Sequence, residues 1–246
     1  MGEWITGRNP IYEVLRSKRR QINRLWIAED AQLSGRLVEI IQLAQSQRVL
    51  IEKIRRTDLD GIDRNHQGAA LSTGAYPYSD LGSIIHTAEK RCEPLFVLLL
   101  DQVQDPQNLG TLLRSAEAFG VHGVILPLAR AAAVTPAVVN ASSGATELLQ
   151  IAQHNLAQAI DQLKQAGGWI IGLEDSPAAQ PPEKVDLRGA IGLVIGNEAI
   201  GLRRLVRGKC DLLMRLPMQG QIDSLNAAVA GSIALYLARQ ARRSAD

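Results

Sequence analysis

Hydrophobic and polar positions follow a repeating order from residue 95 onward. Continuous apolar runs alternate with segments whose apolar residues recur every three or four positions. The runs are typical of parallel strands covered on both faces, and the spaced positions are typical of helices. The alternation predicts an α/β fold with a mostly parallel sheet. The expected strands are 95–100, 123–127, 169–174, 190–196 and 210–218, and the expected helices are 108–120, 155–168 and 224–243.

The first 75 residues show a shorter α/β pattern. A turn and then a helix are predicted over 4–17, because Ile11, Val14 and Leu15 fall on one helical face. Further along, Ser34 is expected to open a helix. We expect a small domain at 1–75, a linker with room for one helix at 76–94, and a second domain at 95–246. The strands expected in the small domain are 22–28, 49–54 and 68–74, and its second helix is 34–47.

Composition narrows the class of protein. Hydrophobic residues make up 46% of the 246 positions and charged residues 21%, as in an ordinary globular protein. Apolar runs are too short to span a bilayer, and no signal-peptide pattern is visible, so we expect a cytoplasmic protein with no membrane partner. Cys92 and Cys210 lie far apart and outside any CxxC pattern, and the histidines lack metal-site spacing. We therefore expect reduced thiols and no metal.

The net charge of +2 does not by itself indicate a nucleic-acid partner. The basic residues are unevenly placed, however, with one run at 16–24 (RSKRRQINR) and another at 203–209 (RRLVRGK). Each run alone could be a solvated face. Two runs in one chain favour a polyanionic partner.

Polar residues follow three of the predicted strands, and ligands of open parallel sheets bind at the carboxyl ends of strands. One of these segments, GNEAIG at 196–201, has glycines at the spacing of a phosphate-binding loop. Such a loop needs a lysine after its second glycine, but Leu202 follows Gly201. The charge of Glu198 would also repel phosphate. The sequence therefore argues against a phosphate loop.

Three segments carry a family resemblance. DPQNLGTLLRSAEAFG, IGNEAIGLRR and LPMQGQIDSLNAAVA are similar, in order, spacing and strand context, to the signature motifs of the SpoU/TrmH (SPOUT) RNA 2'-O-methyltransferases. Near the start, GRNPIYEVLRS and NHQGAAL resemble the substrate-binding domain of the same family. This two-domain pattern is typical of members that methylate a guanosine of large-subunit (23S) ribosomal RNA. The resemblance extends over essentially the whole chain.

The resemblance implies a fold, a cofactor and a reaction. It implies a SPOUT domain whose chain forms a deep trefoil knot, an exception to the rule of unthreaded connections. The knot would form the pocket for S-adenosylmethionine, the protein would act as a homodimer, and the small N-terminal domain would be L30e-like and bind RNA. The implied reaction is metal-free methyl transfer to a ribose 2'-OH. Transfer RNA or another ribosomal nucleotide as substrate, a non-catalytic RNA-binding or ribosome-assembly factor, and a nucleotide hydrolase remain alternatives.

The resemblance also implies catalytic residues, each of which has a structural alternative. Arg114 should lie off the apolar face of its helix, where it could simply pair with Glu117. A guanidinium is a poor base, so Arg114 either has an exceptional environment or stabilises charge and orients phosphate. Asn108 and Ser224 could be helix caps, and Glu198 a carboxylate at a helix N-terminus. The implied catalytic set is Arg114, Asn108, Glu198, Ser224 and Asn226.

The matched motifs imply two binding sets as well. For the cofactor-binding set, the alternative is an ordinary position in the core or in a turn. For His66 of the RNA-binding set, the alternative is a role in a turn. The expected cofactor-binding residues are Gly196, Leu216, Leu225, Ile195, Met218, Leu173 and Asn226. The expected RNA-binding residues are Arg8, Arg16, Lys18, Arg19, Arg20, Arg24, His66 and Arg114. Small residues in the last helix fit either close helix packing or a dimer interface.

Overall fold

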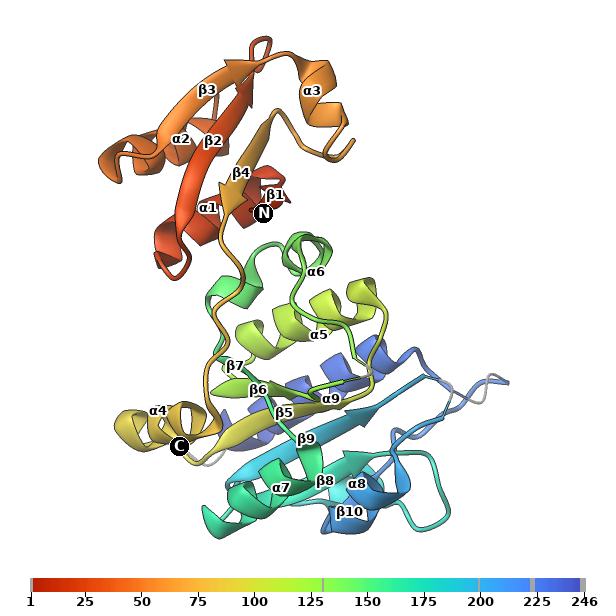
Figure 1. Cartoon of the computed structure of the whole chain (residues 1–246). Coiled ribbons are helices and arrows are strands. Elements are labelled where there is room, and N and C mark those ends of the chain that lie inside the picture. Colours follow the sequence, from red (N-terminus) through yellow and green to blue (C-terminus); the bar gives the residue numbers. More distant parts are fainter. Residues whose placement is uncertain (1, 130, 199, 222–223, 244–246) are drawn as a thin grey trace. The chain divides into compact units, whose positions relative to one another are not determined.

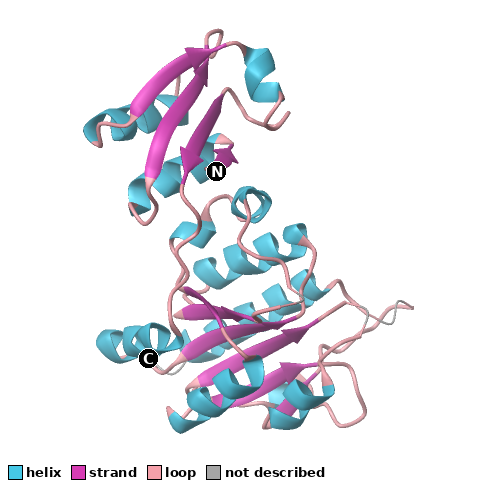
Figure 2. Cartoon of the chain, in the orientation of Figure 1, coloured by secondary structure: helices cyan, strands magenta, loops and turns pink. Residues whose placement is uncertain are grey.

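The computed structural model describes residues 2–129, 131–198, 200–221 and 224–243. The chain forms two compact units, each with its own sheet (Figures 1 and 2). The N-terminal unit consists of Met1–Pro77 and Val134–Leu148, and the C-terminal unit of Tyr78–Ala133 and Leu149–Asp246. The segment 134–148 thus belongs with the N-terminal unit, although the sequence pattern assigned it to the second domain.

The N-terminal unit has a four-stranded sheet with β4 antiparallel to β1 and β2, and β2 parallel to β3. Its strand order is β1 (Glu3–Thr6), β4 (Ala69–Thr73), β2 (Ile22–Ala28) and β3 (Leu50–Ile54). Its helices are α1 (Arg8–Ser17), α2 (Arg36–Ser46) and the short α3 (Arg56–Asp60). Ile11, Val14 and Leu15 of α1 are buried, as predicted from their spacing. The prediction that Ser34 caps α2 is wrong, because the cap is Gly35.

The segment 134–148 contains α6 (Pro136–Ala141) and the 3-10 turn η1 (Ala145–Glu147), and a buried ion pair holds it. The guanidinium of Arg20 donates to Glu147 at 2.8 Å and to Glu3 at 3.0 Å. The side chains of Arg20 and Glu147 are both 0% exposed. Arg19 donates to the backbone carbonyls of Thr146 and Glu147. Two residues of the first basic run therefore serve the packing of this segment.

Breaking this ion pair should destabilise the protein strongly. In Glu147→Gln the buried Arg20 charge loses its buried counter-ion and keeps only the partly exposed Glu3, and breaking a buried pair costs about 3–5 kcal/mol. We expect the free energy of unfolding, measured by urea denaturation, to fall by about 3 kcal/mol. The matched control is Glu39→Gln, which breaks an exposed ion pair with Arg36 and should cost below about 1 kcal/mol. Equal effects of the two substitutions would contradict a structural role for the buried pair.

The C-terminal unit has a six-stranded sheet in which every neighbouring pair of strands is parallel. The strand order is β10 (Leu212–Met214), β8 (Trp169–Leu173), β9 (Ile191–Gly196), β5 (Phe96–Asp101), β6 (Gly123–Leu126) and β7 (Ile151–Gln153). Its helices are α4 (Leu81–Arg91), α5 (Pro106–Ala118), α7 (Leu156–Gln165), α8 (Arg204–Lys209) and α9 (Ala227–Arg243), and a 3-10 turn, η2, spans Pro182–Lys184. The parallel sheet confirms the predicted α/β fold class. The trefoil knot and the L30e-like classification stay predictions.

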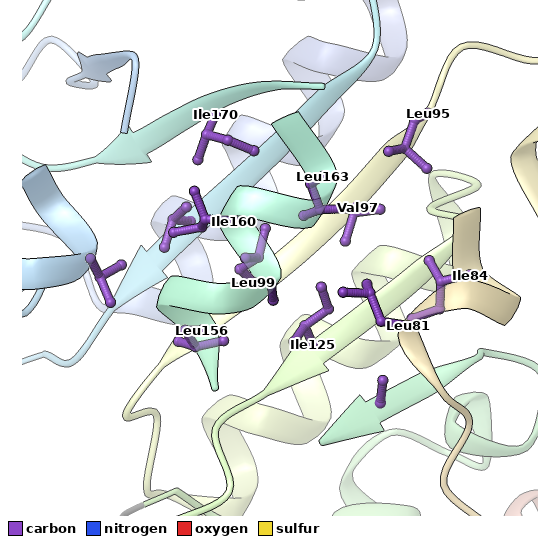
Figure 3. Packing of buried hydrophobic residues seen from close by; sticks show 14 of the residues in the cluster. Leu81, Ile84, Leu95, Val97, Leu99, Ile125, Leu156, Ile160, Leu163 and Ile170 are labelled. Carbon is purple, nitrogen blue, oxygen red and sulfur yellow. The ribbon is translucent and has the colours of Figure 1, made fainter. Parts of the chain in front are cut away.

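Helices cover both faces of this sheet. On one face, side chains of α4, α7 and α8 pack against the strands in a single core, part of which is drawn in Figure 3. On the other face α5 packs against α9, and α9 contacts β9. Every residue of β5 is buried, as its apolar run predicted. Leu81 and Ile84 bring α4 into the core, so much of the predicted linker 76–94 is helix packed on this unit.

Glycine allows α9 to approach its neighbours closely. A Cβ on Gly231 would lie 2.5 Å from Leu112 of α5 and 3.3 Å from Ile195 of β9. The hydroxyls of Ser115 and Ser232 also meet at 2.8 Å between the two helices. The small residues of α9 therefore serve close packing within the chain. Of the helices described, none is both long and apolar enough to cross a membrane.

Candidate active site

A cavity of about 540 Å³ opens beyond the carboxyl ends of β8, β9 and β10. Its lining includes six residues expected to bind the cofactor, namely Leu173, Ile195, Gly196, Leu216, Met218 and Leu225. Glu198 and Ser224, both expected to be catalytic, line it as well. The remaining cofactor candidate, Asn226, is outside the described lining but next to Leu225 in the chain. The structure thus gathers residues from three distant segments around one cavity.

Several apolar side chains around the cavity are exposed. Ile200 is 66% exposed, Leu225 39% and Met218 37%. Apolar surface that is gathered in a concave site is typical of a place where a ligand binds. Ile200 was not predicted from the sequence, because an isolated isoleucine in a loop carries no signal of its own.

The two glycines of GNEAIG build a tight turn rather than a phosphate cradle. Asn197 and Gly201 exchange two backbone hydrogen bonds of 3.1 and 2.9 Å. Gly201 has φ +64°, a conformation that glycine adopts without strain. A Cβ on Gly196 would lie only 2.4 Å from the carbonyl carbon of Gly201. The spacing of the glycines is therefore a requirement of the turn, which sits on the wall of the cavity.

A buried carboxylate fastens this turn to the neighbouring strand. Asp101, the fully buried last residue of β5, accepts hydrogen bonds from the backbone N–H and Nε of Arg203 at 2.8 and 2.6 Å. The side-chain amide of Asn197 donates to the carbonyl of Gln102 at 3.0 Å. Asp101 was not predicted as a site residue, although an acid directly after an apolar run was a usable signal.

The second basic run is largely paired within the protein. Besides the contact of Arg203 with Asp101, Arg207 pairs with Glu174 at 2.8 Å and Lys209 with Asp161 at 2.5 Å. These pairs fix α8 beside the cavity, which Glu174 and Arg207 also line. The run 203–209 is thus explained chiefly by ion pairs of the C-terminal unit.

A chain of hydrogen bonds joins the three motifs. The amide of Asn108 on α5 donates to Glu198 at 2.6 Å. The amide of Asn226 in turn donates to the side-chain oxygen of Asn108 at 3.1 Å. The Asn226 oxygen also accepts the backbone N–H groups of Ala228 and Val229 at the start of α9. Three side chains from distant parts of the sequence are thus held in one line, Glu198–Asn108–Asn226.

Two predicted helix caps are wrong. Asp105, not Asn108, caps α5 by accepting the backbone N–H of Asn108 at 2.9 Å. At α9 the cap is Asn226 rather than Ser224. Both corrections have the same reason, since α5 begins two residues before its predicted start and α9 begins three residues after its predicted start. The side chain of Asn108 is thereby left to bridge Glu198 and Asn226.

Asn226→Asp tests the hydrogen-bonded line separately from the helix cap. Aspartate caps a helix as well as asparagine does, so stability should hold. The carboxylate cannot donate to Asn108, and the loss of one such hydrogen bond corresponds to about a tenfold lower kcat for methyl transfer. Thermal melting and single-turnover kinetics measure the two effects. An unchanged rate would show that the line does not support the reaction.

Arg114 lies on the exposed side of α5. The opposite side of this helix carries Leu109, Leu112, Leu113 and Ala116, all buried as predicted. Arg114 is not among the residues that line the cavity. Its role in catalysis stays a prediction.

Neither the partly buried Cys210 nor, among the described residues, a metal-binding cluster provides another site. Burial raises the pKa of the Cys210 thiol to about 12, so this thiol stays protonated at neutral pH. Among the described residues, no group of three His, Cys, Asp or Glu side chains is placed to hold a metal ion. A metal-free reaction stays a prediction.

The RNA-binding candidates of the N-terminal unit separate into exposed and buried residues. Arg16, Lys18 and Arg24 are exposed. Arg8 lines an open depression of about 490 Å³ that also includes Arg56. These residues stay candidates for contact with RNA.

Arg20 and His66 are corrected, because neither is accessible to RNA. The Arg20 side chain is enclosed between Glu3 and Glu147. His66 is 2% exposed, and its Nδ1 accepts the backbone N–H of Gly68 at 2.8 Å. The alternative that His66 serves the turn is confirmed. Arg19 is partly buried against backbone carbonyls, and its four described carbonyl and hydroxyl partners give it a structural role.

Comparison with known proteins agrees with this arrangement. Residues 95–236 match the model of the SpoU rRNA methylase family, and residues 4–79 match a model described as RNA 2'-O ribose methyltransferase substrate binding. A TrmH-family tRNA/rRNA methyltransferase of Bacillus subtilis (strain 168), YacO, is 38% identical over 236 residues, which are 95% of this chain and 94% of the relative. The chain therefore belongs to the SpoU family of RNA methyltransferases.

Solved structures share the fold. The SpoU methyltransferase AviRb from Streptomyces viridochromogenes superimposes with a TM-score of 0.81 at 24% identity, covering 99% of this chain and 91% of that one. The same enzyme in complex with its cofactor AdoMet gives 0.80 at 25% identity, covering 98% and 90%. An AdoMet-bound rRNA methyltransferase from Sinorhizobium meliloti gives 0.80 at 24% identity, covering 97% and 87%.

Proposed function

We propose that this chain transfers the methyl group of S-adenosylmethionine to a ribose 2'-OH, in a guanosine of large-subunit ribosomal RNA. One observation carries the proposal: the line Glu198–Asn108–Asn226 lies beside a cavity that Glu198 itself helps to line. The hydrogen-bonded line is a fixed polar arrangement, and the cavity has the dimensions of a small-molecule site. The name of the Bacillus subtilis relative includes both tRNA and rRNA, so transfer RNA is the nearest alternative substrate.

The cavity fits S-adenosylmethionine in its chemistry. Its volume of about 540 Å³ lies in the range of small-molecule sites. The apolar wall suits the adenine ring, and Gly196 allows the backbone to approach closely. Glu174 of the lining is paired with Arg207, so the acid that suits the cationic end of the molecule is Asp175. When bound, the cofactor supplies a methyl group on a positively charged sulfur.

The protein's own groups would align and polarise the ribose hydroxyl. Glu198 is held in place by its 2.6 Å hydrogen bond from Asn108, so its position costs little reorganisation during the reaction. The guanidinium of Arg114 would orient an RNA phosphate and stabilise the charge that develops on the oxygen. Alignment of hydroxyl and methyl would contribute much of the rate.

A homodimer and a cytoplasmic location complete the proposal. Val229, Ile233 and Tyr236 are exposed apolar residues of α9, and their spacing puts them on one helical face. Such a face supports self-association through α9. The cytoplasm is where ribosomal RNA is available to the enzyme.

Calorimetry separates the proposed enzyme from the alternatives of a different class. We expect S-adenosylmethionine to bind the purified chain and ATP not to bind. ATP binding without S-adenosylmethionine binding would favour the alternative that the protein is a nucleotide hydrolase. RNA binding without cofactor binding would instead indicate a non-catalytic assembly factor.

Mapping of ribose methylation in ribosomal and transfer RNA from a deletion strain identifies the substrate. We expect the large-subunit RNA of that strain to lack one 2'-O-methylguanosine.

A further inference from the structure

We infer that one face of the N-terminal sheet is a stacking platform for unpaired RNA bases, formed by Trp4 and Trp26 with Arg24 beside them. This inference rests on the proposed function, because it assigns a place to the RNA substrate. Neither tryptophan takes part in the site around the cavity, and neither was singled out by the sequence motifs.

The two faces of the N-terminal sheet are unlike. Leu25 and Ile27 of β2 are buried, whereas the residues that alternate with them, Arg24 and Trp26, lie on the other face. Figure 1 shows α1 and α2 behind the sheet, with the strands β2, β3 and β4 in front of them. On this face a small core of Ala28, Leu59 and Ala70 is covered in part by Trp4 and Trp26, which pack against it and stay partly exposed.

Strand register brings the two tryptophans together on this face. Trp4 pairs with Ser72 of β4, and Trp26 pairs with Ala70 two residues away. The ring centroids of the two tryptophans are 4.2 Å apart, with an angle of 36° between the planes. Both side chains remain partly exposed. The two rings thus form a continuous aromatic surface that is partly exposed to solvent.

The neighbours of the tryptophans fix this surface. The indole N–H of Trp26 donates to Glu52 at 2.6 Å, so its hydrogen bond is satisfied within the sheet. Arg24 contacts the same carboxylate at 3.4 Å while its side chain stays 47% exposed. The charge of Glu52 is therefore offset by Arg24. Leu50, opposite Arg24 on β3, is 56% exposed.

This combination favours RNA bases over other occupants. Bases in single-stranded RNA stack on aromatic side chains and on arginine, and such contacts tolerate many sequences. The exposed guanidinium of Arg24 would contact the adjoining phosphate while it also contacts Glu52. The matched substrate-binding model covers residues 4–79 and so includes the entire face. A protein partner would use the same apolar surface, and the experiment below distinguishes it.

Tryptophan fluorescence provides a direct test. The chain has three tryptophans, so Trp169→Phe leaves only the platform pair as reporters. This variant is titrated with a short unstructured RNA of mixed sequence and with a duplex of the same sequence. We expect saturable quenching by the single strand and little by the duplex. In the same background, Trp4→Leu keeps an apolar side chain and should weaken single-strand affinity about tenfold, as expected for loss of one stacked base.

The controls separate this inference from the proposed function. Trp4→Leu should leave the affinity for S-adenosylmethionine unchanged, and circular dichroism at the titration temperature should show that it is folded, because Trp4 also packs against the core around Ala28 and Leu59. If Trp4→Leu and Trp26→Leu both bind RNA normally, or if quenching is absent although RNA binds, the platform is wrong while the methyltransferase stands. If the wild type binds no RNA at all, the proposed function fails as well. Loss of self-association instead of RNA affinity in Trp4→Leu would assign the face to a protein partner and overturn the inference.

Discussion

Replacing Gly196 by alanine is expected to lower the affinity for S-adenosylmethionine by at least about 100-fold, or ~2.7 kcal/mol. The added Cβ would lie 2.4 Å from the carbonyl carbon of Gly201 and 2.7 Å from the amide nitrogen of Leu202. Both contacts are with backbone, so no side chain can rotate away. The turn closed by Asn197 and Gly201 would have to open, and it forms part of the cavity wall. Calorimetric titration with the cofactor measures the loss.

Gly189→Ala is the matched control for this substitution. Nothing lies within 4 Å of a Cβ at Gly189, and its φ is not in the left-handed region. The control should therefore bind the cofactor like the wild type. Circular dichroism and thermal melting of Gly196→Ala show whether the loss is confined to the site. Undiminished affinity in Gly196→Ala would show that the cofactor does not use this cavity.

Arg114→Ala is expected to lower the rate of methyl transfer by about 10²–10⁴-fold, the range found when a group that transfers a proton or stabilises charge is removed. Affinity for S-adenosylmethionine should stay unchanged, because Arg114 is absent from the lining of the cavity. Stability should also hold, since this side chain is exposed on α5. Single-turnover assays with saturating RNA measure the chemical step separately from RNA binding.

Two further variants serve as a control for Arg114→Ala and as a test of what Arg114 contributes. Arg91→Ala removes an exposed arginine from α4 and should leave the rate unchanged. Arg114→Lys keeps the charge but not the planar fork of donors. Partial rescue by lysine would favour stabilisation of charge over bidentate orientation of a phosphate. A full rate in Arg114→Ala would contradict its assignment to catalysis.

The strands and helices of the C-terminal unit could be predicted because its apolar runs are long and complete. The run that became β5 is buried at every residue. Short elements were missed for the opposite reason: β1 has four residues and β7 three, too few to establish a period. The placement of 134–148 could not be predicted either. It depends on the buried contact between Arg20 and Glu147, which lie 127 residues apart.

The candidate site was predicted from motifs rather than from geometry. The resemblance implied eight residues that the structure then placed around one cavity. It could not show that Asn108 bridges Glu198 and Asn226, because hydrogen bonds between distant segments leave no periodic signal. For the same reason, the basic run 16–24 did not reveal which of its arginines are buried. An arginine carries the same charge whether its side chain is exposed or buried, so a run of basic residues does not indicate which of them are exposed.

Transfer of a labelled methyl group from S-adenosylmethionine to RNA tests the central claim most directly. Ribosomal RNA from a deletion strain is incubated with the wild-type chain, digested with alkali and analysed for label. A 2'-O-methyl group blocks alkaline cleavage, so the account predicts label in an alkali-resistant dinucleotide that contains guanosine, and little or none with Arg114→Ala. Tight RNA binding by the wild type without any incorporation into ribosomal or transfer RNA would contradict it.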